Sequence, residues 1–419
     1  MNILILSTSE RTGGAAIAAN RLMKALINKG INAKALVLNK QTSDKNVISV
    51  RSSFIKKQLA RFNFLWERWI IFVDNRFSRR NLFRVSIANV GFDISGHPLV
   101  KSADIIHIHW INQGFLSLNG IKKLVQTGKP IVWTMHDMWL CTGVCHYAWQ
   151  CEKYVEQCGN CMFLNSNRTK DLSYKVLREK QFLSETNIQI VTVSSWLKEL
   201  AAKSVLTKSL NISVIPNVID TSVFTPLNKQ TARDQLSFPK DKKIILMGAA
   251  KLNDPIKGFE YLRQALALLK EKRDDLLLVL FGKIKNCDTF LSDLAVEHIF
   301  MDAIEDVSLI VQLYAAADVT VVPSHYETFG QTLSEAMACG CPTVSFDNSG
   351  QTDIIDHKVN GYLAKYQDVE DLANGIEWIL FDANYQQLSQ NAYQKAVNFY
   401  SEEIITIQYM QLYENAINS

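Results

Sequence analysis

Two glutamates in the stretch HYETFGQTLSEAMACGCP have the type and spacing to bind a ligand. Glu327 precedes an FGQT segment and Glu335 follows it, eight positions later. The apolar run DVTVVPS predicts a buried strand just before them, and QTLSEAMAC predicts a helix just after. Open α/β sheets place their ligands in loops at the carboxyl ends of parallel strands. We therefore expect both carboxylates near a ligand, the alternative being two ordinary solvated surface residues.

The start of this helix has the features of an anion site. Gly330 lets a ligand approach the backbone, and the amides of Gly330, Gln331 and Thr332 would be free to bind a phosphate. Glu335 lies one turn beyond Gln331 on the same face, about 6 Å along the axis. A carboxylate there would accept hydrogen bonds from both hydroxyls of a ribose. The pattern predicts a nucleoside diphosphate site, with Glu327 on the side of the transferred group.

Strand and helix patterns divide the chain into two α/β halves. Amphipathic segments between apolar runs predict helices, for example at 257–272, and the polar stretch from residue 215 predicts a linker. We expect two doubly wound domains facing a cleft, at 1–210 and 211–395, with 396–419 forming a helix that returns to the first. The predicted strands are ILIL near residue 4, AKALVL near 35, DIIHIHW at 104–110, PIVWTMH at 130–136, QIVTVS at 189–194, KKIILMGAA, LLLVLFG at 276–282, DVTVVPS at 318–324 and PTVSF at 342–346.

Length and composition agree with a chain of two domains. A chain of 419 residues exceeds what one core usually serves, and 47% apolar against 21% charged residues is enough for two cores. The net charge of +4 is too small to indicate a nucleic-acid partner. The sequence has no run of 18 apolar residues, and MNILILSTSE lacks the basic region and cleavage site of a signal peptide. We expect a cytoplasmic protein.

The region around the two glutamates, VVPSHYETFGQTLSEAMACGCPTV, closely resembles the donor-binding signature of retaining GT-B glycosyltransferases of family four, the glycosyl transferases group 1. The resemblance covers most of the chain and implies the GT-B fold, with two Rossmann-like domains. Where the family often has a Gly-Arg pair, this chain has Gly248, Ala249 and Ala250, so Lys257 would be the main cation on the diphosphate. Further matches, in the family's order, are TGGAAIAANRLMKAL, VSSWLKEL, IPNVIDTSVFTP, KLNDPIKGFEYLRQAL and SGQTDIIDHKVNGYL.

The resemblance also implies roles for individual residues. Glu327 would position the sugar and stabilise its positive charge, Lys257 would stabilise the leaving diphosphate, and His136 would line the sugar and acceptor site. On the acceptor side, His109 and Asp137 are further candidates, and a packed strand residue is the alternative for each histidine. The expected donor-binding residues are Gly13, Gly14, Lys257, Phe329, Gly330, Gln331, Thr332 and Glu335.

The function implied by the resemblance is hexosyl transfer with retention of configuration. The donor would be a UDP-sugar or GDP-sugar, and the acceptor a glycan, lipid-linked, in the biosynthesis of a bacterial surface polysaccharide such as lipopolysaccharide. No cofactor or metal would be required for catalysis, and the sequence has no Asp-x-Asp motif. The alternatives are a sugar-nucleotide epimerase and a non-catalytic GT-B-like assembly partner.

Five cysteines lie close together in LCTGVCHYAWQCEKYVEQCGNC. Cys158 and Cys161 form a C-x-x-C pair, which Cys145 and Cys151 could complete as a structural zinc site. His146 or the remaining cysteine is an alternative ligand. Reduced thiols packed in a loop and a disulfide pair remain open as other interpretations.

A basic and aromatic segment spans residues 51–84. It holds nine Lys or Arg residues against two acidic ones, a local net charge of +7, and eight Phe or Trp residues among them. This composition suits an anionic membrane surface, with aromatic rings at the headgroup boundary and cations on phosphates, and would make the enzyme peripheral at the inner face of the membrane. The alternative is a helix whose aromatic residues pack on the first domain. Nucleic-acid binding is disfavoured, because the basic character is confined to this segment.

Overall fold

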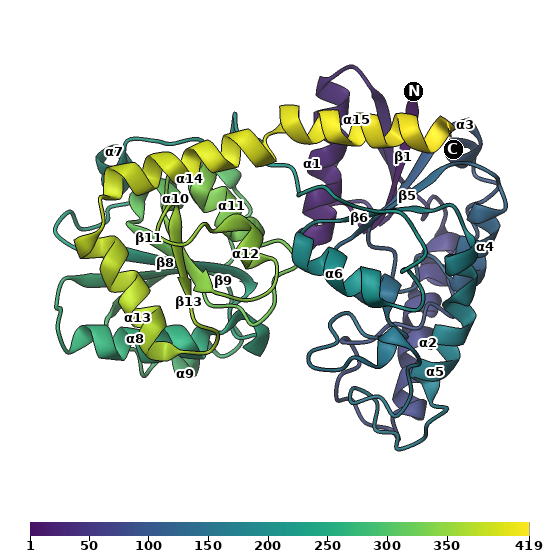
Figure 1. Ribbon diagram of the computed structural model, residues 1–419, viewed down its shortest axis with the longest axis horizontal. Helices are drawn as coiled ribbons and strands as arrows, with labels where there is room; N and C mark the ends of the chain where they lie inside the picture. The colour runs from purple at the N-terminus through teal and green to yellow at the C-terminus, as the bar shows by residue number, and fades with distance from the viewer. Residues whose placement is uncertain (419) are drawn as a thin grey trace. The chain divides into compact units, whose positions relative to one another are not determined.

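The computed structural model describes residues 1–418, apart from the side chain at position 288, and divides the chain into two compact units. The first unit comprises Met1–Ile215 together with the residues from Thr406 onward, and the second comprises Pro216–Ile405 (Figure 1). The last helix, α15 (Glu402–Asn418), therefore begins in the second unit and continues in the first.

Seven parallel strands form the sheet of the first unit, in the order β3-β2-β1-β4-β5-β6-β7. Their central members are almost entirely apolar and buried, as expected where helices cover both faces of a parallel sheet. The strands are β1 (Asn2–Ser9), β2 (Asn32–Asn39), β3 (Val47–Ser49), β4 (Ile105–Ile108), β5 (Ile131–Met135), β6 (Gln189–Thr192) and β7 (Ile212–Val214).

Helices connect these strands, and α15 adds a further one to the first unit. Two tyrosines of α15 reach the sheet, where the Tyr413 hydroxyl lies 2.7 Å from His107 Nδ1 and the Tyr409 hydroxyl 3.0 Å from Thr134 Oγ1. These buried hydrogen bonds hold the helix against β4 and β5. The other helices are α1 (Gly14–Asn28), α2 (Phe54–Asp74), α3 (Pro98–Ser102), α4 (Leu118–Val125), α5 (Leu172–Lys180) and α6 (Ser195–Lys203), with short 3₁₀ turns at Trp139–Cys141, Lys153–Val155 and Gln181–Glu185.

Six parallel strands form the sheet of the second unit, in the order β10-β9-β8-β11-β12-β13. Their side chains pack with α8 and α13 on one face, while α10, α11 and α14 lie on the other (Figure 1). The strands are β8 (Lys243–Lys251), β9 (Leu276–Lys283), β10 (Glu297–Phe300), β11 (Val319–Val322), β12 (Thr343–Phe346) and β13 (Gly361–Ala364). The helices are α7 (Lys229–Gln235), α8 (Phe259–Lys270), α9 (Cys287–Leu291), α10 (Val307–Ala316), α11 (Gln331–Ala338), α12 (Gln351–Ile354), α13 (Val369–Glu377) and α14 (Tyr385–Tyr400), with a 3₁₀ turn at Pro255–Lys257 and a π turn at Trp378–Asp382.

All nine predicted strands are present, and the predicted α/β class with two doubly wound sheets is confirmed. The helix expected at 257–272 is shorter, because Gly258 adopts a φ of 68° and separates the 3₁₀ turn from α8. Among the described residues, no helix combines the length and the apolar character needed to cross a membrane.

Candidate functional site

An ion pair stands beside the carboxyl end of β11. Lys257 Nζ lies 2.7 Å from Glu327 Oε1, and the two side chains are 29% and 18% exposed. Ser324 Oγ donates to the same carboxylate oxygen at 2.9 Å. The Glu327 backbone is also held, since its N–H donates to Ser349 Oγ at 3.1 Å and its carbonyl accepts the Gly350 N–H at 2.8 Å. The carboxylate is thus fixed in place while both charged groups remain accessible to a ligand.

Two glycines allow the loops that carry this pair to approach each other. At Gly258, which follows Lys257 directly, a Cβ atom would lie 1.8 Å from the carbonyl oxygen of Pro323, and φ is 68°. At Gly350 a Cβ atom would lie 2.3 Å from the carbonyl oxygen of Thr328. Any other residue would force the backbones apart, so the sequence builds the site by omitting side chains at these two positions.

The start of α11 presents the predicted donor-binding residues on one face. Gly330 has a φ of 101° and precedes the helix without a side-chain cap among the described residues. Gln331, Thr332 and Glu335 are partly exposed, whereas the residues between and after them on the helix are buried. The Tyr314 hydroxyl donates to Glu335 Oε2 at 3.1 Å. The helix start, the carboxylate and the ion pair all belong to the same end of the second sheet.

Phe329 differs from the other predicted donor residues. Its side chain is 2% exposed and its ring packs edge-on against Tyr400, with ring centroids 5.4 Å apart. The ring therefore supports the loop from the interior, and only the Phe329 backbone could contact a ligand.

In the first unit, the predicted glycines lie at the turn from β1 to α1. Gly13 and Gly14 are exposed, and Gly13 has a φ of 91°. No atom lies within 4 Å of a Cβ built on Gly13, so the space in front of this helix start is open. Glycine is needed here for the backbone conformation rather than for close packing.

The predicted histidines His109 and His136 contact each other at the ends of β4 and β5. His109 Nδ1 lies 2.8 Å from His136 Nε2, and the rings are stacked with centroids 5.1 Å apart. Burial lowers the pKa of His136 to about 4, although Asp137 acts in the opposite direction, and burial lowers the pKa of His109 well below its usual value. Both rings are thus neutral near pH 7. His109 Nε2 is buried and has no hydrogen-bond partner among the described residues.

His107, the other histidine of HIHW, has a structural role in the core of the first unit. It is fully buried, with Nδ1 on Tyr413 and Nε2 2.7 Å from Thr134 Oγ1. Both ring nitrogens are therefore used within the core of the first unit.

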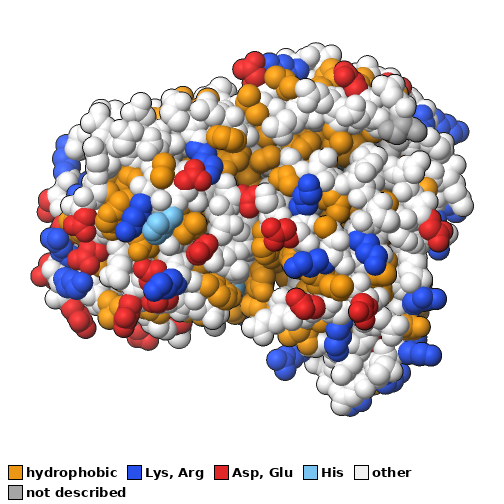
Figure 2. Space-filling view, in the orientation of Figure 1, with side chains coloured by type: hydrophobic (Ala, Val, Ile, Leu, Met, Phe, Trp, Pro, Cys, Tyr) orange, Lys and Arg blue, Asp and Glu red, His pale blue; other side chains and the backbone are white. Residues whose placement is uncertain are grey.

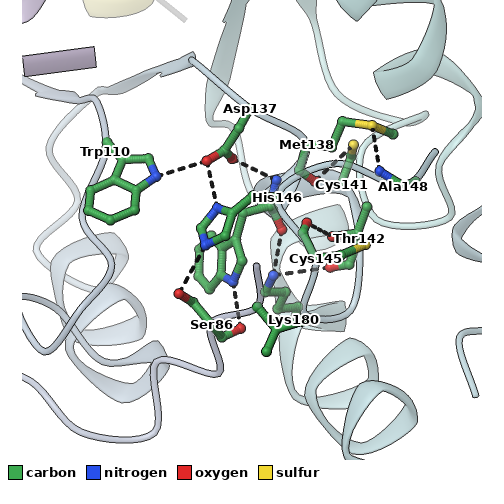
Figure 3. A network of polar contacts seen from close by, with 12 residues as sticks. Ser86, Trp110, Asp137, Met138, Cys141, Thr142, Cys145, His146, Ala148 and Lys180 are labelled. Atoms are coloured by element: carbon green, nitrogen blue, oxygen red, sulfur yellow. Dashed lines mark hydrogen bonds and ion pairs between the residues drawn. The ribbon is translucent and has the colours of Figure 1, made fainter. Parts of the chain in front are cut away.

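Asp137 is the centre of a polar network (Figure 3). Oδ2 accepts a hydrogen bond from Trp110 Nε1 at 2.8 Å and lies 2.6 Å from His146 Nδ1, while Oδ1 accepts the Trp139 N–H at 2.8 Å. Burial would raise the pKa of Asp137, but His146 and these hydrogen bonds outweigh it and lower the pKa, so the carboxylate is charged. Three of its roughly four acceptor positions are occupied, which leaves one for another ligand.

His146 and Lys180 belong to this network (Figure 3), although the sequence did not predict this for either. His146, considered above as an alternative metal ligand, uses its second nitrogen on Ser86 Oγ at 3.0 Å, so neither nitrogen is available to a metal. Lys180 is fully buried, donates to the carbonyls of Trp139 at 2.6 Å and Thr142 at 3.0 Å, and lies over the Trp139 ring. Burial lowers the pKa of Lys180 to about 7. Its position in an amphipathic LREK segment carried no signal for this role.

The four predicted zinc ligands, Cys145, Cys151, Cys158 and Cys161, line one small cavity. All four are free thiols, and burial raises the pKa of Cys158 to about 11. Within the part of the chain that the structure describes, however, no group of three or more His, Cys, Asp or Glu side chains is arranged to hold a metal ion. The structure gathers the thiols but does not form the predicted tetrahedral site.

Models of known protein families match both units of the chain. Residues 12–223 match the family model described as Glycosyltransferase Family 4, and residues 228–395 match Glycosyl transferases group 1. The chain belongs to this glycosyltransferase family. The resemblance predicted from the signature around Glu327 and Glu335 is thereby confirmed at the level of the family.

Curated relatives match different fractions of this glycosyltransferase chain. An uncharacterized glycosyltransferase of Methanocaldococcus jannaschii is 28% identical over 367 residues, 81% of this chain and 91% of the relative. A D-inositol 3-phosphate glycosyltransferase of Stackebrandtia nassauensis is 30% identical, over 53% of this chain and 52% of the relative. An N,N'-diacetylbacillosaminyl-diphospho-undecaprenol alpha-1,3-N-acetylgalactosaminyltransferase of Campylobacter jejuni is 29% identical, over 60% and 64%. The chain thus spans between half and two thirds of the length of the last two.

Solved structures share the fold over nearly the whole chain. Sucrose-phosphate synthase of Thermosynechococcus elongatus has a TM-score of 0.69 at 21% identity, covering 99% of this chain and 98% of the other. WaaG, a glycosyltransferase involved in lipopolysaccharide biosynthesis, has a TM-score of 0.65 at 16% identity, covering 98% and 99%. The GT-B fold predicted for this glycosyltransferase is confirmed.

Proposed function

We propose that this glycosyltransferase moves a hexose, with retention of configuration, from a nucleoside diphosphate sugar to a lipid-linked glycan acceptor in the biosynthesis of a bacterial surface polysaccharide. The observation that carries the proposal is the Lys257–Glu327 pair, 2.7 Å apart beside the exposed face of α11 that carries Glu335. Lys257, Glu327 and Glu335 match the diphosphate, the sugar and the ribose of a sugar nucleotide, respectively.

Each group would act on one part of the donor. Lys257 and the backbone amides at the start of α11 would stabilise the negative charge that develops on the leaving diphosphate. Glu335 would bind the ribose hydroxyls. Glu327 would orient the sugar and stabilise its positive charge in the transition state. Because Lys257 supplies a fixed positive charge for the leaving group, we propose that transfer requires no divalent metal.

In the first unit, we propose that His136 contacts the sugar and the acceptor. A neutral imidazole can donate to or accept from a sugar hydroxyl, and the low pKa of about 4 keeps His136 neutral at physiological pH. His109, through the 2.8 Å contact with Nε2, would fix the tautomer and orientation of the His136 ring.

Relatives favour a UDP-sugar as donor and a polyprenyl-linked acceptor. HepE of Anabaena, which shares the fold with a TM-score of 0.65 at 16% identity, has been solved in complex with UDP-glucose. The name of the Campylobacter jejuni relative specifies an acceptor attached to undecaprenol through a diphosphate. These proteins support the classes of substrate and leave the particular sugars to experiment.

A transfer assay tests the proposal. UDP- and GDP-sugars would be incubated, with EDTA present, with the enzyme and a short saccharide on a polyprenyl diphosphate, and the anomeric configuration of the product determined by proton NMR. We expect product with the anomeric configuration of the donor, loss of transfer in Glu327→Gln, and normal transfer in Glu260→Gln, which alters an exposed glutamate of α8. An inverted product, or transfer that requires a divalent cation, would contradict the proposal.

A structural zinc ion on the cysteine cluster remains a separate hypothesis. The cavity shared by the four thiols favours it, and the absence of a formed ligand group among the described residues counts against it. Metal analysis of protein purified without chelators tests it. Zinc at about one ion per chain that is lost in Cys158→Ser would support the site, whereas protein purified without zinc would refute it.

A further inference from the structure

Helix α2 (Phe54–Asp74) carries an apolar ridge on its outer side. Six apolar residues at alternating spacings of four and three lie along one side of the helix, within an arc of about 80°. All are exposed, from 39% for Val73 to 77% for Ile55. The ridge consists of Ile55, Leu59, Phe62, Trp66, Trp69 and Val73.

The inner side of α2 is the more polar one. Its buried residues include Asn63, Glu67 and Arg68. Glu67 Oε1 accepts the backbone N–H groups of Ile87 at 2.8 Å and Ala88 at 3.0 Å, and Oε2 lies 3.0 Å from Arg68 Nη2. A helix that only packs on its own domain turns its apolar side inward. In α2 the arrangement is reversed, so the expected alternative, that the aromatic residues of this segment pack on the first domain, does not hold for the ridge.

The segment 51–84, which carries the ridge, has exposed cations but no exposed acids. Of the two acidic residues in the segment 51–84, Glu67 is buried and Asp74 is paired with Arg168 at 3.0 Å. Among the described residues, no ion pair joins the exposed cations to a carboxylate. On the face of the second unit seen in Figure 2, by contrast, basic and acidic side chains are interspersed. The exposed cations are Lys56, Lys57, Arg61, Arg76, Arg79 and Arg80.

We propose that this face of α2 docks on the surface of an anionic lipid bilayer. The helix would lie in the plane of the membrane over a length of about 30 Å. Trp66, Trp69 and Phe62 would enter the boundary between headgroups and acyl chains, and the exposed cations of the segment 51–84 would bind lipid phosphates. The proposal concerns binding alone and does not rest on the proposed transfer reaction.

A second copy of the chain is the competing occupant, and charge argues against it. The four-three spacing of the ridge would suit a helix partner. Pairing two α2 helices would, however, bring together two segments whose exposed charges are all positive, with no exposed acid on either to compensate. An anionic bilayer would accommodate the apolar ridge and attract the positive charge of this segment.

Vesicle co-sedimentation of the full chain tests the proposal. We expect binding to phosphatidylcholine vesicles that contain 30% phosphatidylglycerol, and binding at least about 10-fold weaker to pure phosphatidylcholine. The double variant Trp66→Ser, Trp69→Ser should bind the anionic vesicles at least about 10-fold more weakly. Replacing Lys56, Lys57 and Arg61 by Gln should weaken binding by about 5-fold per cation, since each basic residue near an anionic surface contributes about 1 kcal/mol.

Controls separate docking from folding and from catalysis. Phe399→Ser alters an aromatic residue of α14 that is 57% exposed and should leave vesicle binding unchanged. UDP titration and circular dichroism of the Trp variant should match the wild type, because both indoles are exposed. Equal binding of the Trp variant and the wild type, or no binding of the wild type to anionic vesicles, would overturn the proposal. So would light scattering that shows a dimer which the Trp variant converts to a monomer.

Discussion

Replacing Glu327 by glutamine should separate donor binding from transfer. In the structure Lys257 Nζ lies 2.7 Å from the Glu327 carboxylate, which also accepts a hydrogen bond from Ser324. A diphosphate that binds Lys257 must compete with this carboxylate. Glutamine keeps the shape of the side chain and can still accept from Ser324, but it removes the competing charge.

The expected effects of this variant on UDP binding and on transfer have opposite signs and different sizes. A partly exposed ion pair contributes about 0.5–1 kcal/mol, so its loss should strengthen UDP binding by about 2- to 5-fold. Transfer should fall by about 100- to 1,000-fold, the usual effect of removing one group that stabilises transition-state charge. Calorimetric titration with UDP measures the first, and the rate of product formation from the preferred nucleotide sugar measures the second.

Ser324→Ala is the matched control for this variant. It removes the other contact to the same carboxylate oxygen, 2.9 Å away, and leaves the charge of Glu327 in place. We expect UDP affinity within about 2-fold of wild type and a rate reduced by less than about 10-fold, since a single uncharged hydrogen bond contributes about 1 kcal/mol. Weaker UDP binding in Glu327→Gln, or transfer within 10-fold of wild type, would refute the assigned roles of the pair.

Three further variants test the framework around the sites. Gly258→Ala should lower the free energy of unfolding by at least about 2 kcal/mol, measured in urea, because φ is 68° and a Cβ would lie 1.8 Å from the Pro323 carbonyl oxygen; near-wild-type stability would contradict the close approach. Burial lowers the pKa of Lys180 from 10.5 to about 7, so above pH 7 the unfolded chain binds more protons than the folded chain. The free energy of unfolding of the wild type should therefore rise by about 1–2 kcal/mol from pH 7 to 8.5. Lys180→Met should abolish that rise, and the same rise in both proteins would show that Lys180 does not cause it. Tyr413→Phe should cost about 1–3 kcal/mol of unfolding free energy, because it leaves buried His107 Nδ1 without its partner at 2.7 Å; an unchanged thermal midpoint would show that α15 is held otherwise.

The framework of both sheets could be predicted from local pattern. Long apolar runs such as LLLVLFG identify strands that are buried on both faces. The short strands β3 (Val47–Ser49) and β7 (Ile212–Val214), at the two edges of the first sheet, were not predicted. Each has three residues, too few to show a period, and their pairing with neighbouring strands is fixed by the fold rather than by their own sequence.

In the candidate site, too, features set by neighbouring residues could be predicted from the sequence, whereas contacts between distant residues could not. The glutamate spacing and the glycine at the start of α11 are local, and the sequence places them correctly on a loop and a helix. The contact between Lys257 and Glu327 joins residues 70 positions apart, so spacing along the chain carries no information about it. His146 resembled a metal ligand because it lies among cysteines in sequence, whereas in space it faces Asp137 and Ser86.

Lys180 and the ridge of α2 illustrate why burial is hard to predict. A lysine in an amphipathic helix is normally exposed, and only the carbonyls of Trp139 and Thr142 make its burial tolerable. Conversely, the aromatic residues of the segment 51–84 could equally have faced the core. Their exposure depends on the polar residues of α2 finding partners inside, such as the backbone N–H groups that bind Glu67.

The donor site of the second unit is tested most directly by calorimetric titration with UDP and GDP, without divalent metal, of the wild type, Glu335→Ala and Tyr314→Phe. We expect one nucleotide to bind the wild type and the Glu335 variant to bind it about 10- to 100-fold more weakly, as for the loss of a charged hydrogen-bond acceptor. Tyr314→Phe removes the 3.1 Å contact to Glu335 but keeps the carboxylate, so its affinity should stay within about 3-fold. If neither nucleotide binds the wild type, or if Glu335→Ala binds as tightly as the wild type, the assignment of this site to a sugar nucleotide is wrong.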